Sequence, residues 1–261
     1  MTIINTINEI KHVNAEITRG CNLLCDYCFN SSGRRMPDEL NTDDWKRVLN
    51  ISKGYGAKSA LFTGGEVMTR PDASEILSYS LDRGVETSIL SNGYRVPQLS
   101  NDLLKKLSRV QISLDSASPI SHDTRRGNGS WKVAREAIEH ARLYGVPVEI
   151  STTLSFERLD ELEGIAGIAY LTGSKVLVRP LQNIGRALNQ SRTEISDELS
   201  QKHNYLRQRF GDIFVDDFAK YVPILGEEHD ITALKEGFIT ILPNGIVRGS
   251  GKKIFQLSLA A

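Results

Sequence analysis

Three cysteines, the only ones in this 261-residue chain, fall within one short segment as Cys21, Cys25 and Cys28. The spacing Cys-x3-Cys-x2-Cys allows three thiolates to hold three irons of a cubic [4Fe–4S] cluster. The fourth iron then has no protein ligand and is free to bind a small chelating molecule, so we expect the chemistry there. Structural zinc with a further ligand such as His12 is the alternative, but structural zinc sites usually combine two Cys-x2-Cys pairs.

A second motif, Gly64-Gly65-Glu66, follows a short apolar segment downstream of the cysteines. Glycines let a ligand approach the backbone closely, and a carboxylate accepts hydrogen bonds from an ammonium group. A Gly-Gly pair alone is usually only a loop. Its position after the cysteine segment gives it weight.

Together the two motifs resemble those of the radical S-adenosylmethionine (radical SAM) enzymes, in the branch that includes SPASM and molybdopterin-synthesis members. The resemblance covers roughly residues 13 to 190 and includes further short motifs: Ser91-Asn92-Gly93, Gln111-Ile112-Ser113-Leu114-Asp115, His122-Asp123, Arg126-Gly127, Arg179-Pro180 and Gly185-Arg186-Ala187. It implies a [4Fe–4S] cluster and S-adenosyl-L-methionine (SAM) as cofactors. In such enzymes SAM is cleaved reductively to a 5′-deoxyadenosyl radical that abstracts hydrogen from a C–H bond.

The resemblance also implies roles for single residues in the cofactor site. Glu66, with Gly64 and Gly65, is expected to bind the SAM ammonium group, and Tyr27 is expected beside the adenine. Ser113 and Arg126 match positions that contact the SAM carboxylate and ribose region, and the neighbouring Arg125 is the alternative for the arginine. Further expected contacts come from Ser91, from Thr152 or Thr153, and from Asp115, for which a helix N-cap is an equal alternative.

The C-terminal part departs from SPASM relatives because no cysteine follows Cys28. An auxiliary cluster is therefore excluded for this polypeptide, which favours redox-neutral outcomes such as epimerisation. We hypothesise that Ser250 stands at the position of a hydrogen-donor cysteine, as the native residue or as a Cys→Ser replacement; a surface serine is the alternative. Ten acidic against five basic residues between Thr193 and Glu236 suggest a surface for a cationic substrate, although such a run is usually only a solvated face.

The elements that must position these residues alternate between short strands and longer helices. Strands are predicted at Asn14–Thr18, Ser59–Thr63, Thr87–Ser91, Val110–Leu114, Val148–Thr153 and Lys175–Arg179, and helices at Asp43–Lys53, Ala73–Arg83, Asn101–Lys106, Trp131–Tyr144 and Leu159–Leu171. Gly84 and Gly145 mark helix ends. This α/β alternation predicts a partial (β/α)6 TIM-type barrel with the site at the strand carboxyl ends.

Beyond the barrel we expect a C-terminal extension of helices at Asp197–Phe210 and Val215–Tyr221 and a β-hairpin at Phe238–Val247. The chain is accordingly divided into a radical SAM core at residues 1–190 and an extension at 191–261 that packs on the core and contacts substrate.

Composition limits the partners. The 32 basic and 32 acidic residues cancel, so overall charge favours neither nucleic acid nor an anionic membrane. No segment has the length and apolarity of a membrane span, and the unpaired cysteines suit a reducing compartment, so we expect a cytoplasmic protein. Flavodoxin or ferredoxin is the expected electron donor.

The leading prediction is a radical SAM enzyme of the epimerase or isomerase type, acting on a polar, cationic natural product such as an aminoglycoside or aminosugar. Two alternatives stay open. One is modification of a ribosomally made peptide or a carbon-skeleton rearrangement, and the other is a metal- or SAM-binding scaffold without turnover.

Overall fold

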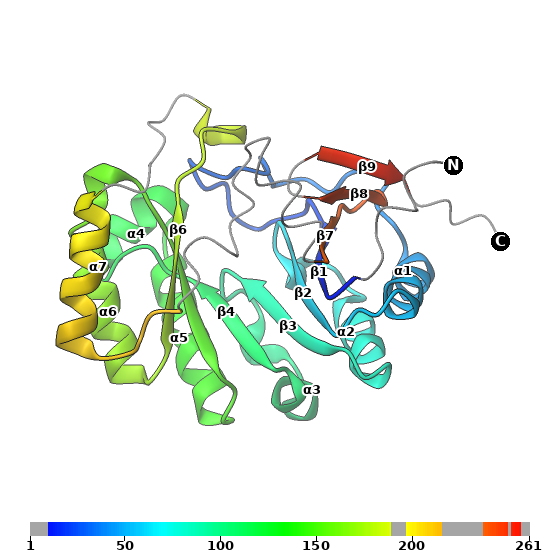
Figure 1. Cartoon of the computed structure of the whole chain (residues 1–261), viewed down its shortest axis with the longest axis horizontal. Helices are drawn as coiled ribbons and strands as arrows, with labels where there is room; N and C mark the ends of the chain where they lie inside the picture. The colour runs from blue at the N-terminus through cyan, green and yellow to red at the C-terminus, as the bar shows by residue number, and fades with distance from the viewer. Residues whose placement is uncertain (1–9, 189–196, 216–236, 250–251, 257–261) are drawn as a thin grey trace.

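A computed structural model describes residues 10–188, 197–215, 237–249 and 252–256. Its centre is one curved sheet with the strand order β6-β5-β4-β3-β2-β1-β7-β8-β9, shown in Figure 1. The strands are β1 (His12–Thr18), β2 (Ser59–Gly64), β3 (Glu86–Ser91), β4 (Arg109–Ser113), β5 (Val148–Leu154), β6 (Lys175–Pro180), β7 (Phe238–Ile241), β8 (Ile246–Gly249) and β9 (Lys252–Gln256). Strands β1 to β6 are parallel, β7 joins β1 in parallel, and β8 and β9 pair antiparallel.

Helices cover the outer face of this sheet (Figure 1). They are α1 (Thr42–Gly54), α2 (Ala73–Asp82), α3 (Asn101–Lys106), α4 (Pro119–Arg126), α5 (Ser130–Leu143), α6 (Glu161–Thr172) and α7 (Asp197–Phe210). Among the described strands β6 and β9 do not pair, so the barrel is open. The prediction of a partial α/β barrel is confirmed.

Local sequence explains the helix boundaries. Asn41 and Asp44 form a capping box at the start of α1, since each side chain accepts a hydrogen bond from the other's backbone N–H. At the other ends, Gly84 and Gly145 have positive φ angles of 68° and 75° just after α2 and α5. Both glycines mark helix ends as predicted.

The two faces of the sheet differ in polarity. On β4 the alternate residues Val110 and Ile112 join the apolar core beneath the helices, together with Ile150 of β5. Gln111, which lies between Val110 and Ile112 on β4, and its neighbour Glu149 on β5 therefore face the inside of the barrel. The barrel interior is polar, and the core lies between sheet and helices.

Two sequence expectations differ from the structure in this region. Helix α4 was not predicted, and its N-cap is Ser118, whose side chain accepts from Ser121 N–H; the N-cap alternative for Asp115 is therefore wrong. Alternate residues of a strand point to the same face, so Thr152 lies on the same face of β5 as Ile150 and Leu154. This face packs against the helices, and Thr152 is fully buried there. It does not line the barrel interior, whereas Thr153 lies on the interior side.

The C-terminal hairpin is confirmed, with Gly245 at a φ of 79° in the turn between β7 and β8. Its first strand pairs with β1 from His12↔Phe238 to Ala15↔Ile241, so the extension continues the main sheet. Helix α7 is also as predicted. The predicted helix at Val215–Tyr221 and the division at residue 190 stay predictions, because residues 216–236 and 189–196 lie outside the described residues.

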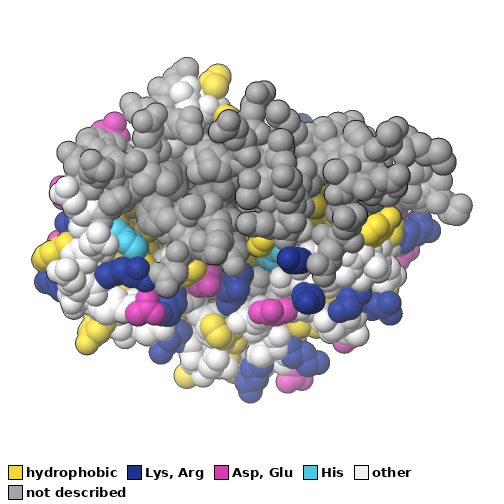
Figure 2. Space-filling view, in the orientation of Figure 1, with side chains coloured by type: hydrophobic (Ala, Val, Ile, Leu, Met, Phe, Trp, Pro, Cys, Tyr) yellow, Lys and Arg dark blue, Asp and Glu magenta, His cyan; other side chains and the backbone are white. Residues whose placement is uncertain are grey.

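The surface carries both charges together. In the described part of the face shown in Figure 2, Lys and Arg side chains lie among Asp and Glu side chains. Within the described residues, no helix combines the length and apolarity needed to cross a membrane.

Candidate functional site

The cysteine loop begins directly after β1 and is held by its own backbone. Cys21 N–H donates to Gly33 O at 2.9 Å. The N–H groups of Leu23 and Ser32 each lie 3.4 Å from a cysteine sulfur, those of Cys21 and Cys28 respectively. All three thiols are partly exposed. Backbone N–H groups directed at sulfur, beside thiols open on one side, fit an iron–sulfur cluster.

The donor set fits a cluster better than a single metal ion. Within the described residues, no three His, Cys, Asp or Glu side chains meet around one point, as zinc would require, whereas a four-iron cluster takes one thiolate per iron. His12 lies at the opposite end of β1, bonded to Ser59 and Asn14, so it cannot complete a zinc site. Burial raises the pKa of Cys21 to about 11, so iron binding must displace its proton.

Gly64 and Gly65 lie where the end of β2 crosses the base of this loop. Gly65 N–H donates to Thr18 O at 2.8 Å. A Cβ on Gly64 would collide with Thr18 O, and one on Gly65 would collide with Gly20 O and lie 2.8 Å from Arg19 O. We expected these glycines to let a ligand approach the backbone closely. In the structure they let another segment of the chain's own backbone approach instead.

The Glu66 carboxylate is fully buried and already engaged. It accepts hydrogen bonds from the Ser91 hydroxyl at 2.9 and 3.0 Å, Asn92 N–H at 2.8 Å and Met68 N–H at 3.1 Å. Burial raises the pKa of Glu66 to about 7, and these hydrogen bonds oppose the shift. In this conformation the carboxylate is not open to a ligand ammonium group. Glu66 and Ser91 instead tie the end of β2 to the end of β3.

Three other predicted site residues meet in one buried network. Asp115 accepts from Arg126 Nε at 2.6 Å and Nη2 at 3.2 Å, from the Tyr27 hydroxyl, and from Thr153 N–H at 2.9 Å. Burial alone would raise the pKa of Asp115, but the Arg126 charge and these hydrogen bonds outweigh it and hold the pKa at about 2. The cysteine loop is thus anchored through Tyr27 to the carboxyl ends of β4 and β5.

The surroundings of Tyr27 differ from those that we expected. The ring is buried, and the guanidinium carbons of Arg125 and Arg126 lie 4.1 and 5.3 Å from its centroid. Both arginines are themselves buried. The Tyr27 ring therefore packs against protein cations, and any contact with adenine would be made at its margin.

The remaining predicted site residues are less tightly placed. Ser113 is half-buried at the end of β4, on the barrel side and in register with Ser151 of β5. It is therefore free to face a ligand above the sheet. Ser250 lies outside the described residues, so its proposed hydrogen-donor role stays a prediction.

Sequence reasoning named Gly185 and Arg186 within a motif but gave no role to them, and they clamp the cysteine loop from outside. Arg186 Nε donates to Cys25 O at 2.7 Å and Nη1 donates to Ser32 O at 2.8 Å, while its N–H donates to Cys28 O at 3.0 Å. Gly185, at a φ of 60°, has no room for a Cβ beside Phe29 O. The Gly-Arg-Ala motif was the available signal.

Glu39 secures the base of the loop, and no pattern in the sequence marked it. Its carboxylate accepts from Arg19 N–H at 2.7 Å and from the Thr18 hydroxyl at 3.0 Å. The side chain is 1% exposed. Only the tertiary fold brings it to the loop.

Comparisons with known proteins agree with this geometry. The sequence profile "Radical SAM superfamily" matches residues 15–166. An AdoMet-dependent heme synthase of Methanosarcina barkeri is 34% identical over 61% of this chain and 47% of its own length. The mycofactocin maturase MftC of Mycolicibacterium smegmatis is 30% identical over 75% of this chain and 49% of its own length. The chain thus spans about half the length of these curated relatives.

Among solved structures, Streptococcus suis SuiB bound to S-adenosylmethionine superposes with a TM-score of 0.76 at 16% identity, covering 93% of this chain and 60% of SuiB. Native anSMEcpe with bound AdoMet has a TM-score of 0.64 at 17% identity, covering 95% of this chain and 75% of its own. At such identities the likeness concerns the fold. The profile match over residues 15–166 shows that this chain belongs to the radical SAM superfamily, whose enzymes use a [4Fe–4S] cluster and S-adenosylmethionine.

Proposed function

We propose that this chain is the radical SAM core of an enzyme that modifies a ribosomally made peptide. The similarity to the maturase MftC, 30% identical over 198 residues, carries the proposal. The subtilosin biosynthesis protein AlbA, at 26% identity, and the sporulation killing factor maturation protein SkfB, at 28%, support it. The names of these relatives therefore support the peptide alternative better than the epimerisation of an aminoglycoside.

The open barrel is compatible with a substrate as large as a peptide. Strands β6 and β9 do not pair with each other in the described part of the sheet, so the strand carboxyl ends can be approached from the side. Substrates of parallel barrels bind at these ends. A closed eight-stranded barrel would admit a ligand only along its axis.

The chain's residues divide the work at the site. Cys21, Cys25 and Cys28 would hold the cluster, and Arg186 fixes the loop that carries them. When bound, the reduced cluster and SAM would supply the radical chemistry for removing hydrogen from a C–H bond of the substrate. Asp115 keeps Arg126 and Tyr27 in place beside the loop, and Ser113 is the hydroxyl free to contact SAM. A flavodoxin or ferredoxin supplies the electron.

Anaerobic reconstitution with iron and sulfide tests the proposal. With dithionite and SAM, the protein should form 5′-deoxyadenosine, and Cys25→Ser should form none. Peptides from small reading frames beside the gene should then acquire a SAM-dependent mass change, read by mass spectrometry. A gain of one deuterium in D2O would indicate epimerisation of a residue, whereas loss of two hydrogens would indicate cross-linking.

A tetrapyrrole substrate is the second candidate, favoured by the heme synthase at 34% identity. Metal-free and iron-loaded porphyrins should be assayed beside the peptides. SAM-dependent conversion of a porphyrin, with every peptide unchanged, would contradict the peptide proposal. Absence of 5′-deoxyadenosine from a fully loaded cluster would leave only the scaffold alternative.

A further inference from the structure

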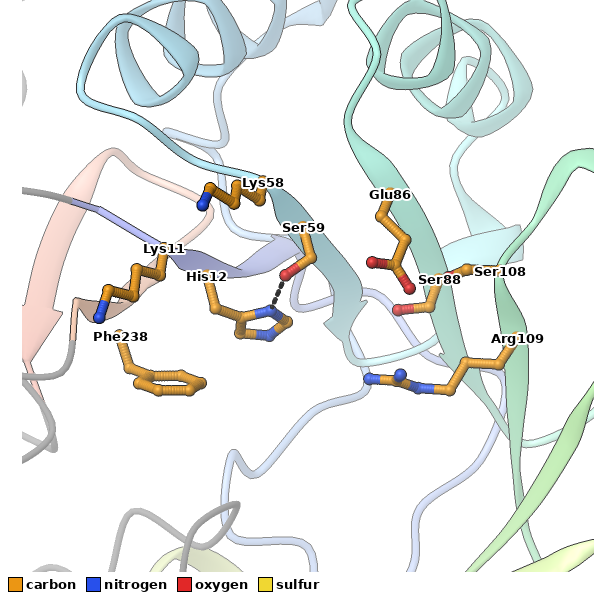
Figure 3. Close-up of a pocket in the computed structure, with 9 residues that line it drawn as sticks. All are labelled: Lys11, His12, Lys58, Ser59, Glu86, Ser88, Ser108, Arg109 and Phe238. Carbon is orange, nitrogen blue, oxygen red and sulfur yellow. Dashed lines mark hydrogen bonds between the residues drawn. The ribbon is translucent and has the colours of Figure 1, made fainter.

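A cavity of about 370 Å³ lies at the end of the barrel opposite the cysteine loop. Its walls include the first residues of five strands, which are His12, Ser59, Glu86, Arg109 and Phe238. Figure 3 shows these side chains around a common space, with Arg109 and Glu86 entering from one side and Phe238 with two lysines on the other. The other six residues of β1 separate His12 from the loop, or roughly 20 Å of strand, so this is a second site.

The lining carries an excess of positive charge. Lys11, Lys58 and Arg109 face a single carboxylate, that of Glu86. His12 adds none at neutral pH, because burial lowers its pKa to about 4. Its ring nitrogens are bonded to Ser59 and Asn14, so it serves as a fixed wall. With the Glu149 carboxylate that pairs with Arg109 included, the three cations exceed the nearby carboxylates by one positive charge, which suits an organic anion.

The described part of the chain does little to neutralise the two lysines. Within the described residues, Lys11 and Lys58 form no ion pair or side-chain hydrogen bond, and both are exposed. Arg109 pairs with Glu149 at 3.4 Å, although its buried Nε makes no hydrogen bond within the described residues. Three like charges around one small cavity repel each other, and a bound anion would relieve that repulsion.

An aromatic surface borders the same space. The Phe238 ring is half-buried and lies 5.4 Å from the His12 ring, tilted by 47°. The three serine hydroxyls nearby are already bonded to protein groups, so charge and the aromatic face are what a ligand can use. A flat apolar group against Phe238 would bury area that inorganic anions cannot.

We propose that this cavity binds a small organic anion whose phosphate or carboxylate group lies among Lys11, Lys58 and Arg109 and whose flat apolar part packs on Phe238. The site is separate from the SAM site and does not depend on the proposed peptide substrate. The surplus charge sets the class of ligand, and the aromatic wall sets the preference within it.

Isothermal titration of the full chain with three probes tests this. Phenyl phosphate should bind at least fivefold more tightly than inorganic phosphate, and phthalate serves as the dicarboxylate probe; binding of either aromatic dianion supports the proposal, and their ratio identifies the preferred anionic group. Lys58→Ala and Lys11→Ala should each weaken phenyl phosphate at least fivefold. Phe238→Ala should reduce phenyl phosphate to the affinity of inorganic phosphate.

Matched variants separate this site from general effects. Lys132→Ala removes an exposed lysine of α5 and should leave binding unchanged, and Cys25→Ser should retain it because the cluster is at the other end. Circular dichroism melting checks that the lysine variants, which change exposed side chains, remain folded. The proposal is overturned if none of the probes binds, or if Lys11→Ala and Lys58→Ala bind phenyl phosphate as the unsubstituted chain does.

Discussion

The two ends of the barrel treat charge in opposite ways. At the cysteine end, the buried Asp115 has its lone pairs taken by Arg126, Tyr27 and Thr153. At the cavity end, Lys11 and Lys58 have no ionic partner among the described residues. A buried charge is costly unless the protein pairs it, whereas an exposed charge is solvated by water and can stay unpaired until a ligand binds. The cysteine end is thus pre-organised by the protein, and the cavity end is left for an anion to complete.

The largest effect is expected at the cysteine loop itself. Cys28→Ser removes one of three cluster ligands and should abolish 5′-deoxyadenosine formation, a loss of over about 100-fold, because a cluster held by two thiolates is not retained. The cluster content of the variant is measured by iron and sulfide analysis and by the visible absorption spectrum. Leu24→Ala, which shortens an exposed side chain of the same loop, should keep the cluster; equal losses would show that the loop, rather than the thiolate, was damaged.

Breaking the buried pair comes next. Asp115→Asn leaves the Arg126 charge buried without its carboxylate and should lower the free energy of unfolding by about 3–5 kcal/mol, measured by urea denaturation. Adding Arg126→Met should recover part of that loss. Glu136→Gln breaks an exposed pair with Lys132 and should cost less than about 1 kcal/mol. Similar losses from both carboxylates would contradict the contrast between buried and exposed charges.

Glu66 gives the cysteine end a pH dependence. The folded protein keeps this proton up to about pH 7, while the unfolded chain loses it near 4.5. Protonated Glu66 therefore favours folding at low pH, and the free energy of unfolding should fall between pH 4.5 and 7 by on the order of 3 kcal/mol. Glu66→Gln should flatten that part of the profile. An unchanged slope in this variant, with exposed Glu139→Gln as control, would assign the pH dependence to another group.

The smallest effect concerns the crossing of β2 over the loop. Gly65→Ala places a Cβ against Gly20 O and should cost about 1–3 kcal/mol and lower cluster content, because backbone must move. Gly167→Ala in α6, where nothing lies within 4 Å, should instead stabilise by about 0.5–1 kcal/mol. Thermal melting of both variants compares them directly. Equal melting temperatures would mean that the crossing tolerates a side chain.

Periodicity predicted most of the fold. The six parallel strands and the hairpin turn at Asn244-Gly245 are local patterns of apolar alternation and turn residues, and the structure contains all of them. Helix α4 was not predicted from the sequence because it is short and polar, with two arginines in its last turn. It is buried through its ion pairs rather than through an apolar stripe, so its pattern resembles that of a loop.

The candidate site was predicted as a set of residues but not as an arrangement. Motif resemblance selected Tyr27, Asp115 and Arg126, and the structure brings them into one network. It did not show that they bind each other. Thr152 and Thr153 are neighbours that point to opposite faces of β5. Which of the two faces the barrel interior depends on the exact register of the strand. Glu39 reaches the loop only through the fold.

By itself, the sequence pointed to the expected cluster ligands, because all three cysteines of the chain lie within one short segment. It also determined the βα alternation, which depends on local spacing. Tertiary structure alone decided which polar groups face a ligand and which bind other groups of the protein. Glu66 and Ser91, for example, form a hydrogen bond with each other. It also brought together the cations of the cavity end, since Lys11, Lys58 and Arg109 become neighbours only when parallel strands align their first residues.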